Sequence, residues 1–194
     1  MVEPAKNKHG IYKNLIILLV VAIINALLSH FAAVAWPSAP GIAALYFAVA
    51  FMIPFTLWFG AWGAIAAYAG CVIGAGLFAV PLTVNLYWSL ADLWQVLIPL
   101  IAFRRFHADV GLKTRRDFLI FLIFGWLLNN LVGAIWGSTM LAAGGVYAWN
   151  SMLNTLLSWF ISNLIVTIVI TTLLLRYVTR LIVRRGLYVE GYWF

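Results

Sequence analysis

Residues 14–35 read NLIILLVVAIINALLSHFAAVA, an apolar stretch without a lysine, arginine, aspartate or glutamate. A helix rises about 1.5 Å per residue, so about 20 apolar residues are needed to cross a hydrocarbon layer about 30 Å thick. The stretch therefore predicts a transmembrane helix. Lys6, Lys8 and Lys13 precede it, as basic residues precede the apolar part of a signal peptide. We expect a retained helix, because the stretch is long enough to span and shows no clear small-residue cleavage site.

The composition of the whole chain agrees with this first segment. Of the 194 residues, 65% are hydrophobic and only 9% are charged, and the mean hydropathy is +1.04. A soluble domain has about 25% charged residues, so this chain cannot cover itself with a water-facing surface. The single cysteine, Cys71, excludes an intramolecular disulfide framework. We therefore predict one transmembrane domain over residues 1–194, in contact with the lipid membrane.

Five more apolar segments follow the first one. Pro37 and Pro40 end the first helix, because proline lacks a backbone donor and favours extended or turn conformations. Irregular backbone is excluded from lipid, so the spans should be helices that close into one all-α bundle. The six predicted transmembrane helices cover residues 14–35, 42–59, 61–80, 85–103, 118–143 and 149–183.

The basic residues fall into three groups. With six crossings, all three groups lie on the same side of the membrane. The positive-inside rule makes that side cytoplasmic, which places both termini there and predicts a multi-pass protein of the cell membrane. Topology and anionic lipid headgroups also explain the net charge of +7 without a nucleic-acid partner. The groups are Lys6, Lys8 and Lys13; Arg104, Arg105, Lys113, Arg115 and Arg116; and Arg176, Arg180, Arg184 and Arg185.

The loops on the opposite side, near residues 36–41, 81–84 and 144–148, hold no charge and are rich in Pro, Gly, Trp and Tyr. Two interpretations are open. The aromatic residues are typical of the belt that lies at the headgroup level of a membrane protein. Alternatively, these loops cover an outward-facing pocket for an organic solute.

Polar side chains recur at steps of three and four residues in the segment 85–103, which places them on one face of a helix. Asp92 is the only acidic residue inside any predicted span. A charge at that depth is costly, so Asp92 is a functional candidate, and the alternative is a carboxyl that is paired or protonated within the bundle. The candidate substrate-binding residues of this face are Asn85, Trp88, Ser89, Asp92 and Gln95.

Two further groups of candidates lie on the following helices. Amides and hydroxyls inside membranes often hold helices together, so each of them alone is weak evidence for a ligand. Three polar groups on consecutive helices instead favour one cluster in the outer half of the bundle, with aromatic rings that suit a small planar solute. The additional candidates are Asn129 and Trp136 in segment 118–143, and Asn150, Asn154 and Ser158 in segment 149–183.

The same residues give little support to catalysis. Asp92 has no histidine in a neighbouring span, and the pairing of nucleophile and base that a hydrolase needs is missing. His30 also has no second histidine in another predicted span with which to share a metal. We therefore expect no catalytic residue, no metal site, no cofactor and no enzymatic activity.

The sequence also contains two patterns of small residues. Segment 14–35 carries Ala22-x-x-x-Ala26, and a Pro- and Gly-rich first outer loop precedes a Gly- and Ala-rich hairpin that includes Gly60-Ala61-Trp62-Gly63-Ala64. Small residues four apart let helices pack closely, most often within one chain. With six helices in about 190 residues, this pattern resembles the substrate-binding S components of energy-coupling factor (ECF) transporters.

The resemblance implies a function. An S component captures a vitamin or a metal near the outer surface with its helices 4 to 6, and uptake is driven by a transmembrane coupling subunit and a pair of ATPases. Carried over to this chain, Ala22 and Ala26 become the contact with the coupling subunit. The polar groups described above become the site for a small vitamin-like solute.

Two other functions are open alternatives. The segment from Trp36-Pro37 to Gly41-Ile42-Ala43 also resembles membrane-embedded sensor domains of signalling proteins. Such a sensor would act here with a separate output protein. The chain could also be a small accessory subunit of a larger membrane complex, whose polar groups meet neighbouring helices.

Overall fold

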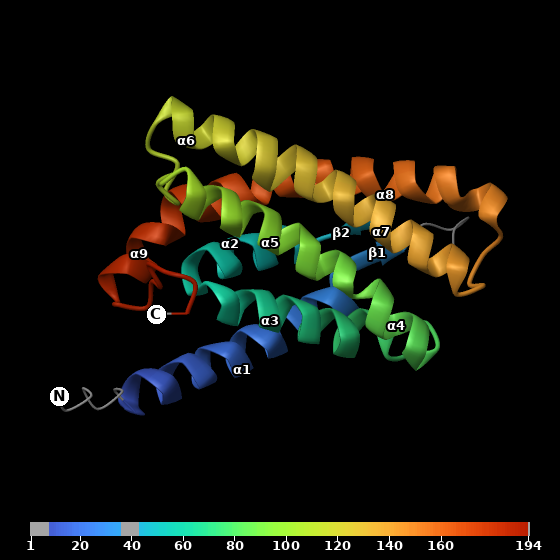
Figure 1. The fold of residues 1–194 in the computed structure, drawn as a ribbon, viewed down its shortest axis with the longest axis horizontal. Helices are drawn as coiled ribbons and strands as arrows, with labels where there is room; N and C mark the ends of the chain where they lie inside the picture. Colours follow the sequence, from blue (N-terminus) through green and yellow to red (C-terminus); the bar gives the residue numbers. More distant parts are fainter. Residues whose placement is uncertain (1–7, 36–42, 194) are drawn as a thin grey trace.

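A computed structural model describes residues 8–35 and 43–193. This part of the chain is mainly helical, and its helices run back and forth along one long axis (Figure 1). In chain order the elements are α1 (Lys8–Phe31), β1 (Ala33–Ala35), β2 (Ala43–Tyr46), α2 (Ala48–Phe59), α3 (Ala61–Cys71), α4 (Leu82–Trp88), α5 (Leu90–Arg105), α6 (Arg115–Ile120), α7 (Asn129–Ala143), α8 (Met152–Val166) and α9 (Thr179–Arg184). Short π- or 3-10-helical segments extend or join them: η1 (Val72–Gly76), η2 (Phe121–Leu128), η3 (Trp149–Ser151), η4 (Thr167–Thr171) and η5 (Leu174–Val178).

Four continuous helices within the described residues are long and apolar enough to cross a membrane: Tyr12–Phe31, Leu82–Arg105, Arg115–Ala143 and Trp149–Arg184. They differ in how deeply they lie in the protein. In Tyr12–Phe31, 22% of the residues in the most apolar 18-residue stretch are buried inside the protein. In Leu82–Arg105, 56% of the corresponding stretch is buried. The segment Leu82–Arg105, formed by α4 and α5, is therefore the more central of the two, while α1 lies at the edge of the bundle.

Residues 42–59 and the end of 14–35 differ from the all-helical prediction. The helix α1 ends at Phe31, and α2 begins only at Ala48. Between them, β1 and β2 form an antiparallel pair in which Ala33 lies opposite Tyr46. This pairing satisfies backbone groups that no helix supplies with partners, which is why a short hairpin is compatible with an apolar environment. The predicted helices over residues 14–35 and 42–59 are therefore wrong at these seven positions, 33–35 and 43–46, whereas the described chain as a whole is mainly helical, as the all-α prediction requires.

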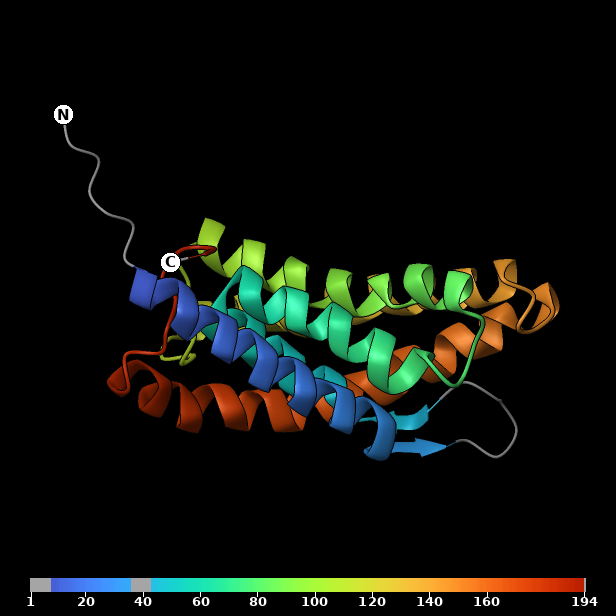
Figure 2. The same cartoon turned by 90° about the horizontal axis from the view of Figure 1, so that it is seen from below.

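Figures 1 and 2 show that α1 begins at the same end of the bundle at which α5 and α9 end and α6 begins. These elements, with the adjoining loop before α6 and the segment η5, carry the described basic residues, so we call this end the basic end. The pair β1–β2, the start of α4 and the start of α8 lie at the opposite end, where the connections 77–81 and 144–148 hold no charged residue. We call it the uncharged end.

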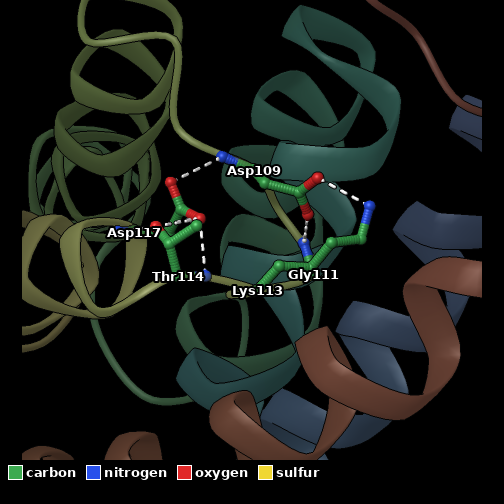
Figure 3. Close-up of polar contacts among 5 residues, drawn as sticks. All are labelled: Asp109, Gly111, Lys113, Thr114 and Asp117. Atoms are coloured by element: carbon green, nitrogen blue, oxygen red, sulfur yellow. Dashed lines mark hydrogen bonds and ion pairs between the residues drawn. The ribbon is translucent and has the colours of Figure 1, made fainter.

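The connection between α5 and α6 at the basic end is organised by two aspartates (Figure 3). The Asp117 carboxylate accepts hydrogen bonds from the backbone nitrogens of Asp109 and Thr114 and from the Thr114 hydroxyl, and it completes a capping box at the start of α6. The Asp109 carboxylate accepts from the Gly111 nitrogen and from Lys113 Nζ, at 2.7 and 2.8 Å. Its hydrogen bond and its charge raise the pKa of Lys113. Both aspartates thus serve the local structure of the loop.

The C-terminal segment 187–193 folds back across the basic end. The guanidinium of Arg104 donates from Nε to the Gly191 oxygen at 3.1 Å, from one terminal nitrogen to the Tyr188 hydroxyl at 2.7 Å, and from the other to the Val189 oxygen. Its carbon also lies 5.4 Å from the centre of the Tyr188 ring. One side chain of α5 therefore holds three successive parts of this segment.

The turn between α2 and α3 receives the same segment. The Ala61 nitrogen donates to the Tyr192 oxygen at 2.6 Å, and the Val189 nitrogen donates to the Trp58 oxygen at 2.8 Å. Gly60 has a φ of 63°, and a Cβ there would lie 2.3 Å from the Tyr192 oxygen. Only glycine allows both this backbone conformation and this close approach.

Candidate functional site

The carboxylate of Asp92 lies inside the bundle with 1% of the residue exposed. Tyr46 of β2 donates its hydroxyl to Asp92 Oδ2 at 2.9 Å, and that hydroxyl lies 2.8 Å from Ser29 Oγ of α1. Side chains of α1, β2 and α5 thus form one hydrogen-bonded chain of two hydroxyls and a carboxylate. The chain ties the β pair and α1 to the centre of the bundle.

No cation pairs with Asp92 in the part of the chain that the structure describes. The ion pair found there joins Lys113 and Asp109 at the basic end. Arg104, on the same helix as Asp92, lies roughly three turns or about 18 Å further along, and its guanidinium is directed to the C-terminal segment. The buried carboxylate therefore depends on hydroxyl donors for its stabilisation.

Two tryptophans cover this region on the side of the uncharged end. The rings of Trp88 and Trp159 meet edge to face with their centres 6.1 Å apart, and both residues are buried. Gly137 of α7 makes room for the second ring, because a Cβ there would lie 2.3 Å from Trp159 Cη2. Neither indole nitrogen has a hydrogen-bond partner in residues 8–35 or 43–193. We refer to these two side chains as the tryptophan layer.

A second polar group lies on the side of the basic end. Gln95 Nε2 donates to Asn130 Oδ1 at 2.9 Å, and Asn130 Nδ2 lies 3.4 Å from Thr167 Oγ1. All three side chains are fully buried, and Gln95 Oε1 has no partner in the described chain. Gly133 allows this arrangement, since a Cβ at that position would lie 2.4 Å from Gln95 Cδ. We refer to Gln95, Asn130 and Thr167 as the amide layer.

Asn163 lies between these two layers. The helices α5 and α8 run in the same direction (Figure 1), and residues four apart on a helix share a face. One turn beyond the tryptophan layer, Trp88 is followed by Asp92 and Trp159 by Asn163. One further turn leads to Gln95 and Thr167 of the amide layer. Asp92 and Asn163 therefore occupy the same level, which we refer to as the carboxylate layer.

The amide of Asn163 is the least satisfied group of the three layers. The residue is fully buried, and neither its nitrogen nor its oxygen has a hydrogen-bond partner in the described chain. A buried polar group without a partner costs about 1–3 kcal/mol. Such groups in native proteins call for an explanation, and ordered water, a bound ion or a functional role are the recognised ones.

The five candidates on segment 85–103 are all buried, as their spacing predicts. Asn85 and Ser89 lie nearest the uncharged end. The Ser89 hydroxyl donates to Asn85 Oδ1 at 2.8 Å, and Asn85 Nδ2 donates to the Val72 oxygen at 3.0 Å. These two side chains therefore join α4 to the start of η1. Trp88, Asp92 and Gln95 each belong to one of the three layers.

Asn129 and Trp136 on α7 differ from each other. Asn129 is fully buried, and neither atom of its amide has a partner within the described residues. Trp136 donates its indole N–H to the Tyr87 oxygen at 2.8 Å and packs edge to face against Trp94, with ring centres 5.8 Å apart. Trp136 thus links α7 to α4 and α5 from outside the three layers.

The three candidates at the start of the last helix are not part of this cluster. Asn150, Asn154 and Ser158 are exposed, whereas Ser162, the next residue in the same pattern, is buried. Four residues turn a helix by about 400°, so a stripe with this spacing rotates by about 40° at each step. Over three steps the stripe turns from the surface into the bundle. The prediction that all three polar stripes converge is therefore wrong for the exposed half of this one.

Ala22 and Ala26, the expected contact with a coupling subunit, lie on the side of α1 that faces α3. A Cβ at Gly74 would lie 2.2 Å from the Ala26 oxygen, and one at Gly70 would lie 3.1 Å from the Ala26 nitrogen. Ala22 is half-buried against the apolar core. The small residues of α1 and α3 thus let these two helices touch within the chain.

Sequence reasoning missed Tyr46 and Ser29, and it left Asn130, Asn163 and Thr167 outside the list of candidates. Tyr46 lies in the predicted apolar helix 42–59, where no neighbouring polar residue indicates a partner for its hydroxyl. The signal available for Asn163 was its position four residues before Thr167 and four after Trp159.

Comparison with protein-family models, curated proteins and solved structures finds no match to this chain. Within the described ranges, the structure brings together no group of three His, Cys, Asp or Glu side chains that could hold a metal ion.

Proposed function

We propose that this chain is an integral membrane protein of six crossings, with both termini cytoplasmic, that binds a small organic solute in the three polar layers. Four helices of sufficient length and hydropathy support the membrane location. So do the many large apolar side chains exposed on the sides of the bundle, such as Leu19, Ile123, Ile161 and Val169. The basic end faces the cytoplasm by the positive-inside rule.

The segments Ala48–Phe59 and Ala61–Gly76 supply the two additional crossings in this proposal. Both are apolar but shorter than a typical span. A short crossing is feasible for α2 because ten of its 12 residues are buried and need not match the thickness of the lipid. The strand β2 continues α2 toward the uncharged end, where pairing with β1 satisfies its backbone.

The observation that carries the solute-binding proposal is the carboxylate layer. Asp92 is buried without a cation, and Asn163 at the same level is buried without any hydrogen-bond partner in the described chain. Polar groups in the interior of a membrane protein are costly, and by default they indicate a functional site. A solute that makes hydrogen bonds with both side chains would offset that cost.

The wider proposal is that this protein is the substrate-binding subunit of an ECF-type importer, with uptake driven by partner ATPases. It rests on the resemblance stated above. The intramolecular contact of Ala26 with α3 leaves the opposite, exposed face of α1 available to a membrane partner, in addition to lipid. That face carries Ile16, Leu19, Ile23 and Leu27.

Native mass spectrometry of the protein, purified from its own host into lipid nanodiscs, tests both proposals. We expect a co-purifying small molecule, and we expect its loss in Asn163→Leu, which keeps the branched side-chain skeleton but removes the amide. Asn154→Leu is the matched control, because Asn154 lies on the same helix but is exposed. This control should retain the molecule.

Three other results would change the conclusion. Loss of the molecule in Asn154→Leu but not in Asn163→Leu would place the site on the exposed surface of α8. A tightly held set of membrane subunits without any small molecule would favour the accessory role. A bound solute without a coupling subunit or ATPases would retain solute binding and contradict the ECF-type importer.

A further inference from the structure

We infer that the solute of the carboxylate layer is a planar organic cation whose N–H donors bind Asp92. This inference deepens the proposed function and rests on it.

The charge follows from Asp92. A carboxylate in a low-dielectric interior is stable only when an opposite charge or strong hydrogen-bond donors compensate it. The described chain supplies the hydroxyl of Tyr46 to Oδ2 but no cation within about 18 Å along the same helix. A cationic solute supplies the missing charge, and its N–H groups make the short, charge-assisted hydrogen bonds that a carboxylate favours.

The planar shape follows from the tryptophan layer. Trp88 and Trp159 stand one turn from Asp92 and Asn163, toward the uncharged end. The electron-rich faces of tryptophan attract cations more strongly than those of other aromatic residues, and they also pack well against flat rings. A cation that is delocalised over a flat group suits both the tryptophans and the carboxylate.

Asn163 adds selectivity for a solute that carries both donors and acceptors. Both atoms of its amide are free in the described structure and fully buried. An apolar cation would leave this amide without a partner, which is unfavourable in a water-poor interior. The uncharged end has no described charged side chain that would repel a cation on entry.

A matched trio of probes tests the inference: benzamidinium, benzamide and benzoate have nearly the same flat shape but are positive, neutral and negative. Isothermal titration in lipid nanodiscs should show that benzamidinium binds at least about tenfold more tightly than benzamide, and that benzoate does not bind. Asp92→Asn should abolish this preference. Asp92→Glu should keep it, which separates loss of charge from loss of fold.

Glu190→Gln is the control, because it removes an exposed acid at the basic end and should leave the preference unchanged. Equal binding of benzamide and benzamidinium, or the same preference in Asp92→Asn, would overturn the inference of a cation. Neither result would affect a co-purified solute found by mass spectrometry, so the two proposals can fail separately. Absence of benzamidinium binding after the co-purifying solute has been removed would also overturn the inference.

Discussion

Tyr46 shows how a single hydroxyl can organise the interior of an apolar bundle. Its oxygen lies 2.8 Å from Ser29 Oγ and donates to Asp92 Oδ2 at 2.9 Å. The Cys71 thiol also faces this carboxylate, but the Tyr46 hydroxyl makes the well-defined hydrogen bond to it. In the absence of a solute, the stability of the buried charge therefore depends on a residue that lies outside the main helices.

Tyr46→Phe should lower the free energy of unfolding by about 1–3 kcal/mol, because it removes the hydroxyl that donates to a buried carboxylate. The midpoint of thermal unfolding in lipid nanodiscs measures the effect. Tyr177→Phe serves as the control, since Tyr177 is 74% exposed and should unfold like the wild type. Equal midpoints for the Tyr46 variant and the wild type would show that the carboxylate does not depend on this hydroxyl.

For single helices, the spacing of polar residues correctly predicted a buried face in segment 85–103 but not in the stripe that begins at Asn150. The pattern in segment 85–103 mixes steps of three and four residues, which average close to 3.6 and keep a stripe on one side of a helix. All of its members are buried. The stripe from Asn150 to Ser162 uses steps of four alone, so it drifts around the helix. Comparing the mean spacing of each pattern with the roughly 3.6 residues of a helical turn would have shown from the sequence that the second stripe does not stay on one face.

Other features of the site and the fold could not be predicted in this way. The pair β1–β2 depends on backbone pairing between residues on both sides of a proline-rich loop, and its residues are as apolar as those of a helix. The C-terminal segment 187–193 is held mainly by backbone oxygens that accept from distant side chains. Backbone acceptors are present at every residue, so no sequence pattern identifies them.

The attachment of the C-terminal segment to α5 leads to a prediction at this scale. Arg104→Gln should free residues 187–193, because it removes a charge-assisted donor set that reaches Tyr188, Val189 and Gly191. Hydrogen bonds to charged groups contribute about 1.5–3 kcal/mol each. Hydrogen–deuterium exchange should therefore show faster exchange at the Val189 amide, by at least about tenfold.

Arg105 provides the matched control. It is the next residue in the same helix and carries the same charge, but it is exposed. Arg105→Gln should leave exchange in the segment unchanged. Similar exchange rates in both variants would mean that the segment is held by the Trp58 and Tyr192 backbone contacts rather than by Arg104.

For the whole molecule, the most informative feature is the separation of charge along its long axis. Among the described charged residues, Asp92 alone lies away from the basic end. At that end Arg104 binds the C-terminal segment, and Lys113 pairs with Asp109 in the loop between α5 and α6. The uncharged end is formed by apolar and aromatic residues and by the β pair. A bundle with one charged end, one uncharged end and apolar sides is suited to insertion in a single orientation.

This orientation can be measured with cysteine labelling, because Cys71 is the only cysteine and is buried. In a Cys71→Ala background, Ser151→Cys introduces a thiol at the exposed start of the last helix, and Lys113→Cys introduces one at the basic end, where the lysine side chain is 76% exposed. A membrane-impermeant maleimide should label the first variant in intact cells. It should label the second only after the membrane is permeabilised.

Two other outcomes would contradict this topology. Labelling of Lys113→Cys but not of Ser151→Cys in intact cells would mean that the orientation is reversed, and the entry route for a solute would then lie on the cytoplasmic side. Labelling of both variants in intact cells would place residues 113 and 151 on the same side of the membrane. The number of crossings between them would then be even, which would contradict the six-crossing topology.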